Sequence, residues 1–249
     1  MLDRSLSIVW YDLPSSARTS YLPWLHGSYI PKLLKKPGIM WAAHYAVHKY
    51  EIPSRMRHTQ DPSVPTGNDY MLLLGARSSH DFSRSAEAYV KAGAPGEDAE
   101  MTADDLKMLA LRTNQRTSIM TEEARVDGPD IKLRPQGTAP APCIQLGTLN
   151  GNNQAAEDEL LAWYARWRMP ALGKLPGCVA MRKTVSVSGW AKHGVMYEFV
   201  SLDARSEGIK TIGMLYPEMM AWTERFIPTL THAPGSPHIG LRLWPPVNN

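Results

Sequence analysis

The sequence predicts an α+β fold of two tandem ferredoxin-like units, each with the element order strand, helix, strand, strand, helix, strand. Three observations predict it. The 249 residues are 43% hydrophobic and 20% charged, which is ordinary for a globular chain long enough for two domains of about 100 to 150 residues. A 20-residue segment recurs in the second half of the chain. Similar apolar runs and turn signals flank both copies.

The recurring segment begins at Trp24 and again at Trp163, and the two copies align without a gap. Six of the 20 aligned positions are identical, whereas unrelated segments share about one position in twenty. The identities include a proline in mid-segment, Pro31 or Pro170, and a closing Pro-Gly pair, both of which constrain the backbone. Tandem duplication therefore explains the match better than chance does.

Each element of the first half has a local reason. The apolar run 6–11 predicts a strand, and the polar stretch after Pro14 predicts the start of a helix. Pro31 is expected to kink or end this helix, because proline lacks a backbone donor and clashes with the preceding turn. The Pro37-Gly38 pair predicts a turn into the next strand. The remaining expected elements are strands at 39–50, 70–76 and 117–126 and helices at 81–92 and 104–112.

The second half repeats this order. Asn152 and Asn153 precede an acidic turn, which predicts a helix start. The other expected elements are strands at 143–149, 178–188, 195–202 and 238–244 and a helix at 217–226. Residues 127–142 are rich in proline and glycine and predict a connector. We therefore expect a first unit at 1–130 and a second unit at 131–249.

The first copy resembles the dimeric α/β-barrel superfamily, nearest to its EthD-like branch, in the run Trp24-Leu25-His26-Gly27, in Pro31 and in Pro37-Gly38-Ile39. In that superfamily two ferredoxin-like units pair their sheets into a barrel, so the resemblance implies that this duplicated chain builds a dimeric α/β-barrel type fold by itself. Members include cofactor-independent monooxygenases, isomerases, lyases and haem enzymes. The fold therefore does not name the reaction.

The composition argues against several classes of protein. A net charge of +3 is too small for a nucleic-acid footprint, which needs a clustered basic face. No 18 apolar residues run together and residues 1–11 do not read as a secretory signal, so we expect no membrane partner and a cytoplasmic setting. Cys143 and Cys178 have no Cys or His at metal-ligand spacing. Nucleotide-binding and α/β-hydrolase motifs are absent, so we expect neither a metal nor a cofactor.

Residues that differ between the two copies are candidates for function, because duplication lets one copy keep the scaffold while the other diverges. In the alignment His26 faces Ala165 and His44 faces Lys183, and His26 is the residue that the resemblance favours. A histidine exchanges protons near neutral pH, and a tyrosine stabilises a developing oxyanion. We predict His26 as general acid or base, His44 as its partner and Tyr29 as oxyanion donor. The competing interpretation is a histidine on the helix surface or packed at the seam between the units.

Five further residues are predicted to bind substrate. By the two-residue period of a strand, His48 shares a face with His44, and Trp41 lies on the other face. Glu123 and Arg125 share a face, and an ion pair between them that only stabilises the fold is the favoured alternative. His44 and His48 lie about 13 Å apart along an extended strand, too far to share one metal ion. The predicted substrate-binding residues are Trp24, Trp41, His48, Glu123 and Arg125.

These residues predict a cofactor-independent enzyme that acts on an aromatic or polyketide-like oxygenated small molecule by histidine acid/base chemistry. Isomerase or lyase, monooxygenase and hydrolase reactions all remain open. The substrate is expected inside a barrel lined by Trp and Tyr, and a homodimer is possible. The alternative is a non-catalytic ligand-binding or interaction protein whose barrel is packed solid. A haem enzyme would need an axial histidine, for which His193, His232 and His238 are the candidates.

Overall fold

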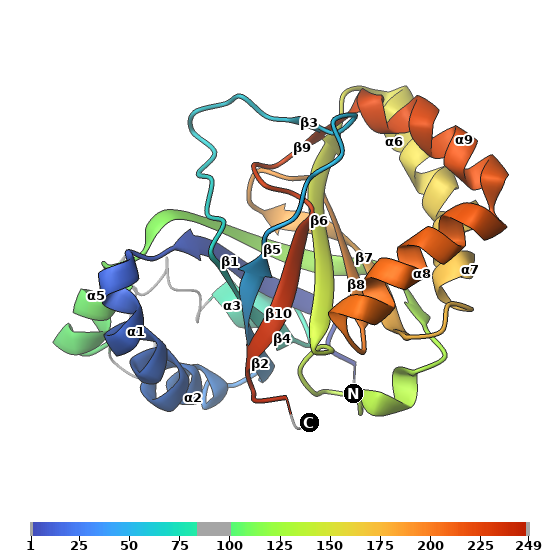
Figure 1. Cartoon of the computed structure of the whole chain (residues 1–249). Helices are drawn as coiled ribbons and strands as arrows, with labels where there is room; N and C mark the ends of the chain where they lie inside the picture. Colours follow the sequence, from blue (N-terminus) through green and yellow to red (C-terminus); the bar gives the residue numbers. More distant parts are fainter. Residues whose placement is uncertain (1, 84–100, 248–249) are drawn as a thin grey trace.

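The computed structural model, which describes residues 2–83 and 101–247, shows a mixed α/β fold in which eight strands close into an antiparallel barrel (Figure 1). The barrel strands are β1 (Ser5–Asp12), β2 (Ile39–His48), β4 (Tyr70–Ala76), β5 (Thr113–Asp127), β6 (Cys143–Gly151), β7 (Cys178–Ser188), β8 (His193–Phe199) and β10 (His238–Trp244). Their order is β10-β2-β4-β1-β5-β7-β8-β6, and a second pairing, between β6 and β10, closes the ring. Two short strands, β3 (Arg57–His58) and β9 (Leu230–His232), extend the sheet beyond the end of β6.

Helices cover two flanks of the barrel. Figure 1 shows α1, α2 and α5 on one flank and α6 to α9 on the other. The first group comprises α1 (Arg18–Trp24), the π-helical turn η2 (Leu25–Tyr29), α2 (Ile30–Leu34), α3 (His80–Ser83) and α5 (Ala103–Leu109). The second comprises α6 (Gln154–Trp163), the π-helical turn η4 (Tyr164–Arg168), α7 (Met169–Leu172), α8 (Leu202–Leu215) and α9 (Pro217–Phe226). Short 3-10 turns lie at η1 (Ser15–Ala17), η3 (Ile131–Leu133) and η5 (Ile227–Thr229).

The two halves of the sheet have the same internal strand order. The first half runs β2-β4-β1-β5 and the second runs β7-β8-β6-β10, and the β5–β7 and β10–β2 pairs join them. The aligned Pro-Gly turns also agree, because Gly38 and Gly177 adopt φ of +91° and +81°, which a side chain would disfavour. A Cβ on Gly177 would approach Ala204 Cβ to 2.7 Å.

The mid-segment prolines, which were predicted to kink or end their helices, do not end them. In each copy a π-helical turn immediately precedes the short helix that holds the proline, η2 before Pro31 and η4 before Pro170. A π-helical turn absorbs the backbone hydrogen bond that proline cannot make and the extra space its ring needs. The helical path therefore continues through the proline in both halves.

The barrel interior is a packed core. Apolar side chains from β1, β2, β4, β5, β6 and β8 fill it, as expected for a barrel of this size. Its largest members are Trp10, Tyr45, Trp41, Met71 and Met120. Two further cores lie between the outer face of the sheet and the two groups of helices. The predicted location of the substrate inside a Trp- and Tyr-lined barrel is therefore wrong, because the core side chains occupy that space.

Most predicted elements lie where the sequence places them, and the missed ones include helix α8 and the short strands β3 and β9. The strands at 178–188 and 238–244 and the helix at 217–226 have the predicted bounds. Helix α8 was not predicted, and much of the predicted helix at 81–92 lies outside the described residues. Among the residues that the structure describes, no helix is both long and apolar enough to cross a membrane.

Candidate active site

His26 and His44 lie within hydrogen-bond distance between the outer face of the sheet and the first helix. His44 is on β2 and fully buried, and His26 is half-buried on the π-helical turn η2. His26 Nε2 lies 2.8 Å from His44 Nδ1, and the ring centroids are 5.0 Å apart, edge to face. The structure therefore brings together two of the three residues predicted to be catalytic, 18 positions apart in sequence.

Tyr11 extends this pair into a chain of three groups. Its hydroxyl lies 2.8 Å from His44 Nε2, and its ring is nearly parallel to the His44 ring. Both rings also stack on Tyr70, which lies on the strand between them, at centroid distances of 5.6 and 5.3 Å. Sequence reasoning missed Tyr11, because its contact with His44 crosses β4 and depends on the strand order. Both ring nitrogens of His44 are thus engaged, one by Tyr11 and one by His26.

The environment keeps the histidine chain neutral. Burial lowers the pKa of His44 well below 6.5, and the nearby His26 and Arg112 lower it further. Burial also lowers the pKa of His26. Arg112 donates from Nε to the Tyr21 hydroxyl, and its guanidinium lies 4.5 Å from the centre of the Tyr11 ring. Arg112 therefore places a positive charge against the face of the Tyr11 ring.

This chain has two proton arrangements, because a neutral imidazole donates from one ring nitrogen and accepts at the other. In one, Tyr11 donates to His44 Nε2 and His44 Nδ1 donates to His26 Nε2, so His26 carries its proton on Nδ1. In the other, His26 Nε2 donates to His44 Nδ1 and His44 Nε2 donates to the Tyr11 oxygen. His26 Nδ1 is then free to accept a proton. The chain can therefore present either a donor or an acceptor at His26 Nδ1, and a proton taken up there leaves His26 as an imidazolium next to the neutral His44.

Trp24 and Tyr29 flank His26 on the same helical segment. Their rings stack at a centroid distance of 4.9 Å. Trp24 Nε1 donates to Asp105 Oδ1 at 3.2 Å, and Lys32 donates to Asp105 Oδ2 at 2.6 Å. Asp105 also closes a capping box at the start of α5. These contacts fix the helix that carries His26, and the role of Tyr29 as oxyanion donor stays a prediction.

Three of the residues predicted to bind substrate lie away from the histidine pair. Trp41 points into the barrel and donates from Nε1 to Asp3 Oδ2 at 2.7 Å. Arg125 pairs with Asp3 at 3.1 Å and with Glu122 at 2.6 Å, not with Glu123 as predicted. Glu123 instead forms an ion pair with Lys183. The reason is an irregularity between β5 and β7 at 122–124, which breaks the simple alternation of faces.

Buried arginines and carboxylates form a network around Asp3, at the end of the barrel where β1 begins. Asp3 Oδ2 accepts hydrogen bonds from Arg134 at 2.9 Å and from Arg182 at 2.7 Å, and Arg134 also pairs with Glu198 at 2.8 Å. All four side chains are buried. Each carboxylate therefore has arginine partners, which is what a buried charge requires. Trp41 and Arg125 belong to this structural network and not to a site around His26.

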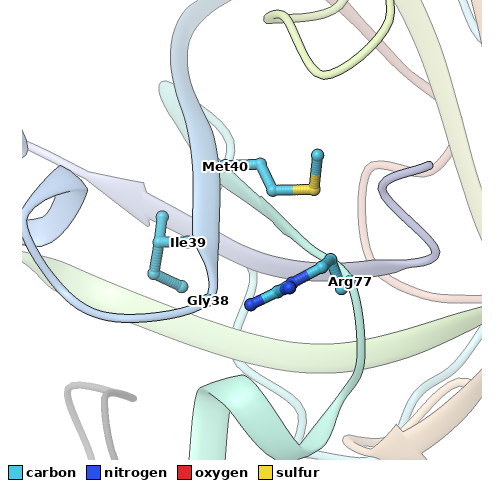
Figure 2. Close-up of a pocket in the computed structure, with 4 residues that line it drawn as sticks. All are labelled: Gly38, Ile39, Met40 and Arg77. Carbon is cyan, nitrogen blue, oxygen red and sulfur yellow. The ribbon is translucent and has the colours of Figure 1, made fainter. Parts of the chain in front are cut away.

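His48 and a shallow pocket at the start of β2 lie on opposite sides of His44 along the strand. His48 is half-buried at the end of β2, four residues after His44. A pocket of about 240 Å³ lies at the start of β2, lined by Gly38, Ile39, Met40 and Arg77 (Figure 2). Figure 2 shows Arg77 reaching from the end of β4 toward Gly38. This pocket includes neither His26 nor His44.

The residues do not fit a haem. His232 and His238 are buried, with ring nitrogens 3.2 Å from Arg57 O and 2.9 Å from the Asn68 side chain. His193 is buried under α6, near Glu157. A macrocycle beside His193 would need the space between the sheet and α6, α8 and α9. Aromatic rings packed edge to face or at a tilt fill that space, namely Trp163, Tyr164 and Phe226. Among the described residues, no group of three His, Cys, Asp or Glu side chains is placed to hold a metal ion.

Solved structures of other proteins share the fold of this chain. No protein-family model matches the sequence, and no curated protein matches it. A candidate monooxygenase from Fusobacterium nucleatum subsp. nucleatum ATCC 25586 superposes with a TM-score of 0.59 and 9% identity, over 97% of this chain and 93% of that one. An anthrone oxidase-like protein gives 0.57 and 10% identity, over 96% and 90%. A candidate chlorite dismutase gives 0.53 and 16% identity, over 98% and 96%. The chain therefore shares the α/β-barrel fold of these proteins.

Proposed function

We propose that the chain is a cofactor-independent enzyme that removes a proton from an oxygenated aromatic or polyketide-like small molecule, with His26 as the base. The observation that carries the proposal is the 2.8 Å contact between His26 Nε2 and His44 Nδ1. His44 is buried and held by Tyr11 on its other side. A half-buried histidine backed by a second histidine and a phenol has the composition of a proton-transfer chain.

Monooxygenation is the reaction that we favour among the open classes. Removal of a proton from an activated methylene or phenol leaves an electron-rich anion that dioxygen oxidises directly. For a methylene, one oxygen atom becomes the carbonyl oxygen of the product, and the other leaves as water with the two hydrogens. His26 Nδ1 takes the first proton, and the chain returns a proton to the departing oxygen. Two of the structural neighbours carry the descriptions monooxygenase and anthrone oxidase-like, which supports this choice.

The two halves of the chain have a common origin in this proposal. We infer that an ancestral ferredoxin-like unit of the EthD-like branch was duplicated, giving units at 1–130 and 131–249 with a connector at 127–142. The equal strand order of the two halves and their equivalent π-helical turns support this origin. Only the first unit carries the histidine pair, since the aligned residues are Ala165 and Lys183. The cytoplasmic setting and the possible homodimer stay predictions.

The test is oxygen consumption by purified protein with a panel of anthrones, hydroxynaphthalenes and related phenols. We expect one substrate class to support uptake of dioxygen, and His26→Gln to reduce kcat by about 10²- to 10⁴-fold, the usual contribution of a positioned acid or base. Arg166→Gln, an exposed change on the equivalent turn of the second half, should leave kcat unchanged. Equal rates for wild type and His26→Gln would contradict the proposal. Binding of panel compounds without turnover would favour the non-catalytic ligand-binding alternative.

A further inference from the structure

The end of the barrel opposite Asp3 holds a buried arginine with no carboxylate partner. Arg116 lies on β5 directly across from Trp10, and its guanidinium carbon sits 4.4 Å from the centre of the Trp10 ring. Its side chain is only 5% exposed. Arg116 Nη1 donates to the backbone oxygens of Pro65 and Pro234, both at 3.3 Å. In the part of the chain that the structure describes, no acidic side chain lies within 4.0 Å of it.

At the other end of the barrel, around Asp3, the buried arginines do have carboxylate partners. There, Arg134 and Arg182 share two buried carboxylates, so their charges are compensated. Within residues 2–83 and 101–247, Arg116 contacts backbone oxygens and the face of an indole ring and no carboxylate. Burial lowers the pKa of Arg116 to about 10, and no carboxylate offsets that shift. The side chain nevertheless stays charged at neutral pH, so its positive charge is buried without a counter-charge, which costs free energy.

Arg116 Nη2 is buried and has no hydrogen-bond partner among the described residues, and the same holds for three polar atoms on neighbouring elements. Within the described residues, Trp10 Nε1, His238 Nδ1 and Thr148 Oγ1 have no hydrogen-bond partner. The Trp10 and His238 rings lie 6.2 Å apart. The backbone N–H of Thr148 donates to Ser236 Oγ, two residues before His238. These atoms gather near a buried positive charge that has no carboxylate partner among the described residues, which points to a ligand of opposite charge.

The tautomer of His238 makes its free nitrogen a donor. The Asn68 amide meets its hydrogen-bonding needs when its nitrogen faces His238 Nε2 at 2.9 Å and the backbone oxygens of Thr66 and Gly67. His238 Nε2 is then the acceptor, and the neutral ring carries its proton on Nδ1. Trp10 Nε1, Arg116 Nη2 and His238 Nδ1 are therefore all N–H donors. A set of donors around a positive charge matches the chemistry of an anion and not that of a cation.

We propose that this end of the barrel binds a small monovalent anion, of halide to formate size, through Arg116, Trp10, His238 and Thr148. The side chains that form the site are almost fully buried, which limits the ligand to a few atoms. The bound anion neutralises Arg116. It also ties the segments that contain Pro65 and Pro234 to the barrel, because Arg116 holds both.

The probes are chloride and formate, added to the whole chain in a buffer whose anions are too large for the site. We expect the wild-type melting temperature to rise saturably with chloride, since a ligand that binds only the folded state stabilises it. We also expect an excess ³⁵Cl NMR line width that formate removes by competition. Arg116→Met removes the charge and keeps an apolar side chain of similar length, and it should abolish both effects. Arg182→Met changes a compensated arginine and should retain them.

A second variant keeps the proposal testable if Arg116→Met does not fold. Trp10→Phe keeps a ring under the guanidinium and removes one N–H donor, so it should weaken chloride binding by about ten-fold, as expected for one hydrogen bond to a charged group. The proposal is overturned if the wild-type chain shows no excess ³⁵Cl line width, which is the result expected when water fills the site. Equal chloride responses of the wild type and either Arg116→Met or Trp10→Phe also overturn it.

Discussion

Three of the four buried histidines have strongly lowered pKa values, so we predict that the fold loses stability in mild acid. Burial lowers the pKa of His232 to about 4, that of His238 to about 3 and that of His44 well below 6.5. From about pH 7 to about pH 5.5 the folded chain keeps these three rings neutral, while the unfolded chain protonates them near its ordinary pKa of 6.5. The unfolded state thus binds more protons, so the free energy of unfolding falls as the pH falls.

The size of the effect follows from proton linkage. A ring with an unfolded pKa of 6.5 and a much lower folded pKa loses about 1.3 kcal/mol of stability between about pH 7 and about pH 5.5. Three such rings together lower the free energy of unfolding by about 4 kcal/mol. This is a large part of the roughly 5–15 kcal/mol that typical domains have. Asp3 does not contribute in this range. Burial alone would raise its pKa, but Arg182, Arg134 and Arg125 hold the pKa below 3.8, so its stabilisation is lost only in stronger acid.

The assay is urea unfolding of the whole chain at closely spaced pH values. We expect the free energy of unfolding to fall by about 4 kcal/mol over this range, and by about one third less in His44→Gln, which removes one of the three rings. Tyr45→Phe is the matched control. It removes a buried group that donates to Ala141 O and does not titrate here, so it should lower stability at every pH by the same amount. A total loss no larger than that of one histidine would refute the reasoning.

Three other predictions concern single contacts. Tyr11→Phe leaves His44 Nε2 buried without its partner; it should cost about 1–3 kcal/mol in urea unfolding and change the His44 tautomer signals in ¹⁵N NMR. Arg182→Met removes one partner of the buried Asp3; because two other arginines remain, the cost should be at or below the roughly 3–5 kcal/mol typical of a broken buried pair. Thr102→Ala removes the side chain that caps α5; it should cost about 1 kcal/mol, whereas Thr102→Ser should restore the stability.

Local signals predicted much of the fold, because the same signals shape the chain in both halves. The Pro-Gly turns required glycine at positive φ, which made Gly38 and Gly177 reliable markers for the strands that follow. Helix α8 was missed because Gly208 and Gly213 weaken its helical pattern. A Cβ at Gly208 would lie 2.8 Å from a terminal methyl of Leu175, so Leu175 packs closely over this glycine. Sequence periodicity does not report such packing.

The candidate site was predictable only in part, for reasons of geometry. His26 and His44 stood out because the aligned residues of the second copy are not histidines, and the helix-over-sheet arrangement brings them together. Tyr11 did not stand out, since its contact with His44 depends on β4 lying between β1 and β2. Arg116 and His238 are still further apart in sequence. Their shared position at the end of the barrel exists only once β10 and β5 are part of one closed sheet.

The second half differs from the first beneath its π-helical turn. Beneath its π-helical turn the Tyr164 and Tyr197 hydroxyls lie 3.0 Å apart, and Arg168 reaches Tyr197 at 3.4 Å. Burial and the neighbouring Tyr197 raise the pKa of Tyr164 well above 10. This phenol therefore keeps its proton at neutral pH, whereas the imidazoles under the first turn exchange theirs through two tautomers. The same scaffold thus carries a pair of histidines under one turn and a hydrogen-bonded pair of tyrosines under the other. Variants under the second turn should therefore alter stability and leave the proposed proton transfer unchanged.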